Sequence, residues 1–169
     1  MKKLQFIVLA IIATTFFISC QDSKHISNAD DLGKYAFDIL KKFENSSKED
    51  YVNSLLTLEE FKSFAKKNGD SMQQVVKESI EKLDKKTYES GLLRQYTLLK
   101  DKAKELNISW NAIEYGDFTY EERTDDGMTG IRGQLTFTHN GTQYEVSTSA
   151  LLTDNVYVPV IINQLNEKN

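Results

Sequence analysis

The sequence predicts an α+β domain in which N-terminal amphipathic helices cover one face of a four-stranded antiparallel meander sheet. Three observations predict this fold. Apolar residues recur with the period of a helix face up to about residue 108, and then alternate with polar residues as in strands. Three short turn signals of Asp, Asn and Gly divide the alternating part into four strands. The chain has 169 residues, 40% of them hydrophobic, which suits one domain with a single core.

Helices are expected between residues 29 and 108. Ser47 to Asp50 has the composition of a helix start, and Thr57 with Glu60 forms a capping box, in which each side chain bonds the backbone of the other residue. Gly91 weakens the join between the last two apolar patterns, so these are either one kinked helix or two. The apolar faces lie at residues 32–43, 51–55, 58–65, 72–83 and 92–106.

Strands are expected between residues 109 and 164. Asn140-Gly141 is the strongest short signal for a two-residue turn of type I′. With this turn, the apolar side chains of the two flanking strands meet on one face without any adjustment, which supports the register. The expected pairs are Phe137 with Tyr144, Leu135 with Val146, and Ile131 with Ala150.

The turn Asp126-Gly127 fixes the first strand in the same way. Two of the resulting pairs set an aromatic ring opposite a glycine, which is a known way of covering bare backbone. The expected pairs are Phe118 with Leu135, Tyr120 with Gly133, and Gly116 with Phe137.

The last strand is expected at residues 156–162, after the turn Asp154-Asn155. Pro159 has no N–H to donate, so this strand should lie at an edge of the sheet or show its free side there. Residues 165–169 are interpreted as a tail.

The first 19 residues have the pattern of a signal peptide. Lys2 and Lys3 precede a run from Leu4 to Ile18 that is almost entirely apolar. As a helix this run reaches only about 22 Å, which is less than the hydrocarbon layer of a membrane, about 30 Å thick. The run is therefore interpreted as an export signal rather than a membrane span.

The segment Phe17-Ile18-Ser19-Cys20 resembles the lipobox of bacterial lipoproteins, and the Ser-Cys junction is similar to those of Bacteroidota. The resemblance implies cleavage before Cys20, acylation of this cysteine and attachment to a membrane, with the outer membrane expected. Cys20 is the only cysteine, so no disulfide competes for it. Several acyl chains make a stable anchor. Residues 20–28 are interpreted as the lipidated cysteine and a polar tether.

Acidic residues gather in the first strand and its turn. Residues 110–169 contain three bases and nine acids, which disfavours nucleic-acid binding because phosphates need a basic surface. Two interpretations stay open: a face that binds a basic envelope protein, or a solvated sheet edge that uses charge to resist aggregation. The acids concerned are Glu114, Asp117, Glu121, Glu122, Asp125 and Asp126.

The chain shows no catalytic motif, so a non-enzymatic binding or interaction protein without a cofactor is expected, such as an inhibitor, an immunity-type protein or an accessory subunit. Its two histidines, His25 and His139, are too few for a histidine-based metal site, and His139 is expected to be exposed at a hairpin end.

The alternative is a ligand carrier or enzyme. The order of helices and sheet resembles small lipoproteins of cystatin-like or NTF2-like architecture, but no strand is interleaved among the helices, and no functional residue is carried over. In this alternative Glu114 supplies a carboxylate with a raised pKa inside an aromatic-lined pocket. The candidate pocket residues are Trp110, Phe118, Tyr120, Phe137 and Tyr144.

Overall fold

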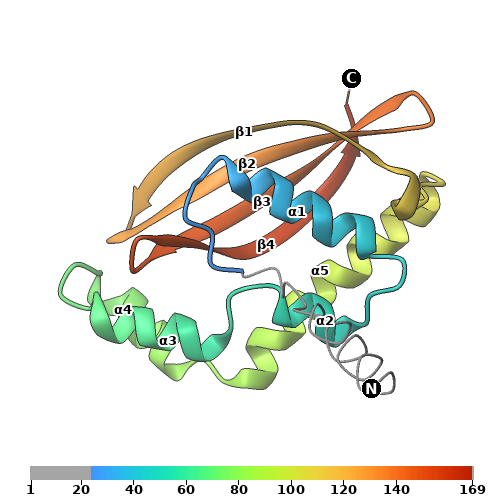
Figure 1. Cartoon of the computed structure of the whole chain (residues 1–169). Helices are drawn as coiled ribbons and strands as arrows, with labels where there is room; N and C mark the ends of the chain where they lie inside the picture. Colours follow the sequence, from blue (N-terminus) through green and yellow to red (C-terminus); the bar gives the residue numbers. More distant parts are fainter. Residues whose placement is uncertain (1–23, 169) are drawn as a thin grey trace, which may run out of the picture.

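A computed structural model describes residues 24–168 of the chain (Figure 1). The expected signal peptide, the lipidated Cys20 and the first residues of the tether lie outside this range. Between residues 24 and 168, no helix is both long and apolar enough to cross a membrane.

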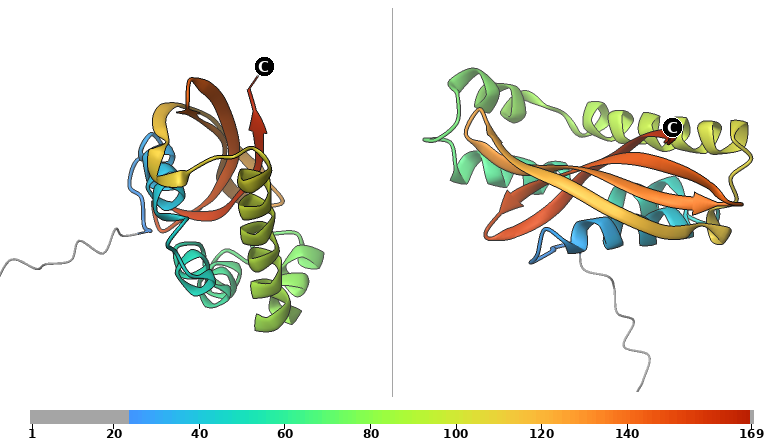
Figure 2. Two further views of the ribbon diagram at one scale, coloured as in Figure 1. Left: turned by 90° about the vertical axis from the view of Figure 1, so that its right-hand side faces the viewer. Right: turned by 90° about the horizontal axis from the view of Figure 1, so that it is seen from above.

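The predicted α+β fold is confirmed. Five α-helices and one short 3-10 helix precede a four-stranded antiparallel sheet in the order β1-β2-β3-β4 within the described range. The helices lie on one side of the strongly twisted sheet, with α1 and α5 packed against it (Figure 2). The helices are α1 (Asp31–Lys42), α2 (Lys48–Asn53), α3 (Leu58–Lys67), α4 (Gln74–Lys82), α5 (Lys85–Glu105) and η1 (Trp110–Ala112). The strands are β1 (Glu114–Asp125), β2 (Met128–His139), β3 (Thr142–Thr153) and β4 (Val156–Glu167).

Side-chain caps define where α2, α3 and α5 begin. The expected capping box at Thr57 is present before α3, and the expected helix start at Ser47 is also a capping box, before α2. The last two apolar patterns of the helical part form two separate helices, α4 and α5, and not one kinked helix. The break lies at Leu83 and Asp84 rather than at Gly91, because the Asp84 side chain accepts a hydrogen bond from the backbone N–H of Thr87 and starts α5. Gly91 lies inside α5.

The β2–β3 register is the predicted one, including all three apolar pairs. The β1–β2 pairs of Phe118 with Leu135 and of Tyr120 with Gly133 are also confirmed. The pair of Gly116 with Phe137 was wrong, since Tyr115 occupies that position. The cause is a bulge between Tyr115 and Phe118, which inserts residues into β1 without a partner in β2.

Two boundaries from the sequence analysis are corrected by the structure. β4 continues to Glu167 and Leu165 is buried, so residues 165–167 belong to the sheet and not to a tail. The end of the expected tether is also part of the domain, because Ile26 is buried and forms a backbone bridge with Tyr157 in β4. Both segments consist mainly of polar residues, so nothing in the sequence indicates that they belong to the domain. One buried apolar side chain attaches each segment to the core, Ile26 in the first and Leu165 in the second.

β4 is an edge strand, as Pro159 predicts, but its outer side is covered. The backbone N–H of Leu56, in the link between α2 and α3, donates to the Pro159 carbonyl at 2.6 Å. The Tyr51 hydroxyl in α2 donates to the Ile162 carbonyl at 3.0 Å. The helices therefore close one edge of the sheet and leave β1 as the free edge (Figure 1).

Candidate binding site on the bare face of the sheet

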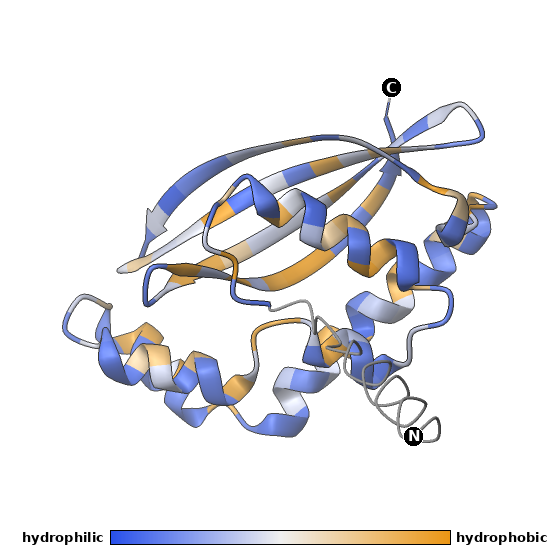
Figure 3. Ribbon diagram, viewed as in Figure 1, coloured by the Kyte–Doolittle hydropathy of each residue, from blue (hydrophilic) through white to orange (hydrophobic). Residues whose placement is uncertain are grey.

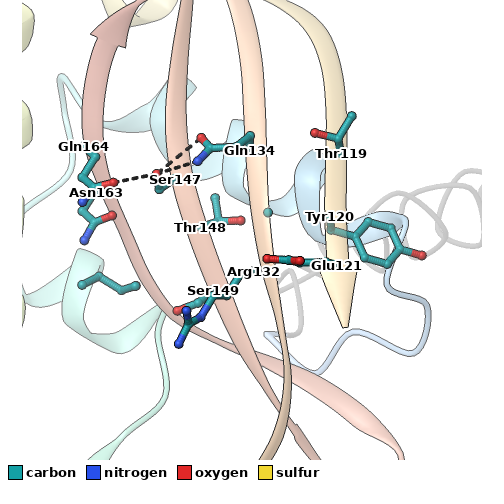
Figure 4. Close-up of a pocket in the computed structure, with 12 residues that line it drawn as sticks. Thr119, Tyr120, Glu121, Arg132, Gln134, Ser147, Thr148, Ser149, Asn163 and Gln164 are labelled. Carbon is teal, nitrogen blue, oxygen red and sulfur yellow. Dashed lines mark hydrogen bonds between the residues drawn. The ribbon is translucent and has the colours of Figure 1, made fainter. Parts of the chain in front are cut away.

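Side chains alternate between the two faces of the sheet. In β2 and β3 every second residue, from Ile131 to Phe137 and from Tyr144 to Ala150, is buried toward the helices. The residues between them point to the opposite side, which we call the bare face because α1 lies behind the strands when this face is viewed (Figure 4).

The bare face contains a hollow of about 560 Å³ that extends across all four strands. Such a volume lies within the range of small-molecule and peptide pockets, about 300–1,000 Å³. Most of its lining residues are polar, and three of them, Tyr120, Gly133 and Thr148, belong to the row that alternates toward the helices. Its residues are Thr119, Tyr120, Glu121, Arg132, Gly133, Gln134, Ser147, Thr148, Ser149, Ile161, Asn163 and Gln164.

Hydrogen bonds join three of these side chains across three strands. Gln134 Nε2 in β2 donates to Ser147 Oγ in β3 at 3.0 Å, and Ser147 Oγ contacts Gln164 Oε1 in β4 at 3.0 Å (Figure 4). Gln164 has a φ of 56°, a left-handed conformation that costs a residue other than glycine about 1–3 kcal/mol. Local strain of this kind is concentrated at functional sites, and here it lies at the rim of the hollow.

The hollow carries one acid and one base, so it is neutral overall. Glu121 in β1 lies directly opposite Arg132 in β2. Each has its ionic partner elsewhere, because Glu121 contacts Arg123 at 2.5 Å and Arg132 contacts Asp125 at 3.5 Å. The site therefore suits a ligand that forms hydrogen bonds rather than one with a large net charge.

The six acids of the predicted interaction face are not brought together on one surface. Glu122 accepts a hydrogen bond from the Tyr157 hydroxyl at 2.6 Å on the helix-covered side, and this bond raises the pKa of Tyr157 to about 12. Asp126 is bonded to Gln73 at 2.5 Å, and Asp117 accepts a bond from the backbone N–H of Phe118.

Glu114 is exposed to solvent at the start of β1, so it does not supply the buried carboxylate that the alternative requires. β1 is the free edge strand, and eleven of its twelve residues are exposed while the twelfth is partly buried. Charges on such an edge oppose pairing with strands of other molecules, in agreement with the second interpretation of the acids.

Most aromatic residues of the predicted pocket belong to the core. Trp110, Phe137 and Tyr144 are buried, and their rings pack in series with centroid distances of 6.0 Å and 5.6 Å. Phe118 is partly buried and stacks on Tyr120, which is 41% exposed. Only Tyr120 of these five lines the hollow described above.

His139 was expected to be exposed, and this prediction was wrong. It is buried, and its Nε2 accepts a hydrogen bond from the backbone N–H of Ser109 at 3.3 Å, which ties β2 to the segment after α5. His25 lies 3.5 Å from Glu60. Over residues 24–168, no group of three or more His, Cys, Asp and Glu side chains is placed to hold a metal ion.

Fold and site together define an α+β protein with helices on one side of a meander sheet and a neutral polar hollow on the other. Comparison of the chain with protein-family models, with curated proteins and with solved structures found no match. The function therefore has to be inferred from the residues themselves.

Proposed function

We propose that this chain is a bacterial envelope lipoprotein, held to the outer membrane by acyl chains on Cys20, that binds a protein partner through the bare face of its sheet without catalysing a reaction. The observation that carries the binding proposal is the neutral hollow with its bonded side chains Gln134, Ser147 and Gln164. The anchor proposal rests on the lipobox pattern before Cys20.

The chemistry of the hollow selects the kind of partner. Amide and hydroxyl groups both donate and accept hydrogen bonds, as does a polypeptide backbone. A glycan commonly stacks on exposed rings, whereas the single aromatic residue of this lining, Tyr120, belongs to the row that faces the helices, where it stacks on Phe118 and its hydroxyl is bonded to Asp30. A neutral polypeptide segment laid across the strands therefore fits the hollow best.

The rival function as an NTF2-like carrier or enzyme receives less support. Its acid, Glu114, is exposed, and its pocket residues Trp110, Phe137 and Tyr144 pack against one another. A basic partner for the acids is also less well supported, because Glu122, Asp125 and Asp126 have partners within the domain.

The first prediction concerns the anchor. In a Triton X-114 partition the wild-type protein should enter the detergent phase, because several acyl chains hold a protein stably in a lipid-like phase. Cys20→Ser removes the only thiol that can be acylated, so the variant should move to the aqueous phase. Unchanged partitioning of Cys20→Ser would contradict the anchor.

The second prediction concerns the hollow. The lipidated chain is used as bait in detergent-solubilised envelope from its source bacterium. Ser147→Arg should abolish capture of a partner, because a long cation then fills the centre of the hollow and breaks the bonds to Gln134 and Gln164. Gln164→Gly should also weaken capture while it relieves backbone strain, so lost binding is separated from lost stability.

Two controls make this test specific. Thr97→Arg places the same cation on an exposed position of α5 and should leave capture unchanged. Glu114→Lys with Asp126→Lys tests the acidic interpretation: capture should persist in this variant and in high salt, since the hollow is neutral. If Ser147→Arg captures the same proteins as the wild type, or if the acid variant alone fails, the bare face is not the binding surface.

A further inference from the structure

The helix-covered side of the molecule has an apolar groove of about 330 Å³ between α3 and α4. It is lined almost entirely by apolar side chains, and Val75 is 66% exposed there. Figure 3 shows hydrophobic residues on both helices of this pair. Contact with another protein or with a membrane would remove this apolar surface from water, which stabilises such a contact. The lining residues are Phe61, Val75, Val76, Ser79, Ile80 and Leu83.

The groove arises because α4 has a wider apolar face than the domain covers. Ile80 is buried in the cluster that joins α3 and α4 to Leu151 and Val158 of the sheet. Val75 and Ser79 lie beside that face and remain exposed. The groove is therefore an extension of the core that opens to the outside.

The chain enters the domain next to this groove. Lys24, the first described residue, is pinned to α3, because its Nζ lies 2.8 Å from Glu60 Oε2 and 3.0 Å from the Leu55 carbonyl. The next residue of α3, Phe61, lines the groove and contacts Tyr88 with a centroid distance of 6.4 Å. Glu60 and Phe61 point about 100° apart on the helix, so the entry point and the groove lie on different sides of α3 within the same helical turn.

The length of chain before Lys24 limits how far the groove can lie from a membrane. Lys24 follows Cys20 by four residues, which span at most about 14 Å when fully extended. Acyl chains on Cys20 would thus hold α3 close to the lipid surface. Amphipathic helices at such a surface bury their apolar face about 5–10 Å deep, at the boundary of headgroups and acyl chains.

We propose that the α3–α4 groove docks on the lipid surface of the membrane that holds Cys20, with Val75 inserted at the boundary of the acyl chains. The proposal rests on the anchor in the proposed function. It also orients the protein, because α3 and α4 pack on the helix-covered side of the sheet, so the hollow on the bare face is directed away from the lipid (Figures 1 and 4).

The test uses the acylated chain that starts at Cys20, in which Cys20 is blocked and an introduced cysteine is the only free thiol. An NBD fluorophore is attached at Val75→Cys or, as the control, at Leu98→Cys, which replaces an exposed apolar residue of α5 outside the groove. The proteins are reconstituted into vesicles of phosphatidylethanolamine and phosphatidylglycerol that contain nitroxide-labelled lipid, and vesicle-bound protein is isolated by flotation.

We expect a blue shift and quenching of NBD at position 75, and neither at position 98. A label at Ser79→Cys should also be quenched. Adding Val75→Asp to that protein should remove the quenching without changing flotation, because a charge opposes insertion of the groove. Floating protein without quenching at position 75, or with equal quenching at both positions, overturns the docking and leaves the anchor intact. Burial of position 75 only in native envelopes would assign the groove to a protein and overturn the lipid proposal. Failure to float overturns anchor and docking together.

Discussion

Phe137→Ala is expected to lower the free energy of unfolding by about 3–5 kcal/mol, the usual cost of truncating a fully buried phenylalanine. Phe137 is 0% exposed and lies between the rings of Trp110 and Tyr144. Its removal would leave a cavity beneath the middle of the sheet that neighbouring strands cannot close. Urea denaturation followed by circular dichroism measures the change.

Tyr120→Ala is the matched control, since Tyr120 was assigned to the same pocket but is 41% exposed. It stacks on Phe118 and donates one exposed hydrogen bond to Asp30, so its loss should lower the free energy of unfolding much less than the loss of Phe137. A pocket-lining role for Phe137 would give a small effect similar to that of Tyr120→Ala. Equal costs for the two variants would therefore contradict a packed aromatic core.

Gly127→Ala is expected to destabilise the protein by about 2–5 kcal/mol, from backbone strain and a steric clash together. Gly127 has a φ of +79° in the turn between β1 and β2, which is the left-handed region. A Cβ at this position would lie 1.9 Å from the backbone oxygen of Ser71, so the turn or the link between α3 and α4 has to move.

Gly141→Ala separates the two causes. Gly141 has nearly the same φ, +80°, but a Cβ there would meet nothing within 4 Å. Only the strain remains, which is about 1–2 kcal/mol. Thermal and urea unfolding of both variants measure the difference. If the two substitutions had the same cost, the β1–β2 turn would not be packed against the link between α3 and α4.

The register of the sheet could be predicted because each hairpin turn fixes the pairing of all residues beyond it. Asn140-Gly141 determines ten pairs of β2 and β3 without interruption. The bulge near Gly116 could not be predicted in this way, because it depends on a contact made after folding: the backbone N–H of Asp117 donates to Thr136 Oγ1 at 2.9 Å. The Gly116–Phe137 pair was wrong for this reason.

The hollow was missed, although its residues were visible in the sequence as the polar half of the alternating pattern. Arg132 and Gln134 belong to this polar half in β2. The hollow depends on the twist of the four strands and on the hydrogen bonds that join Gln134, Ser147 and Gln164 from three of them. Neither the twist nor these bonds can be predicted from a short stretch of sequence.

Aromatic residues illustrate the reverse error. Trp110, Phe137 and Tyr144 were proposed as pocket residues because they are close together in the sheet region, but composition does not distinguish a pocket from a core. Burial does, and all three are at most 6% exposed. His139 similarly follows the polar residues of its hairpin in sequence, yet the segment after α5 covers it.

The most direct test of the proposed anchored lipoprotein is the intact mass of the protein purified from the envelope of its source bacterium. We expect a chain that starts at Cys20 and whose mass exceeds that of residues 20–169 by the mass of its acyl groups. A chain that retains residues 1–19, or one that starts elsewhere with an unmodified Cys20, would contradict it.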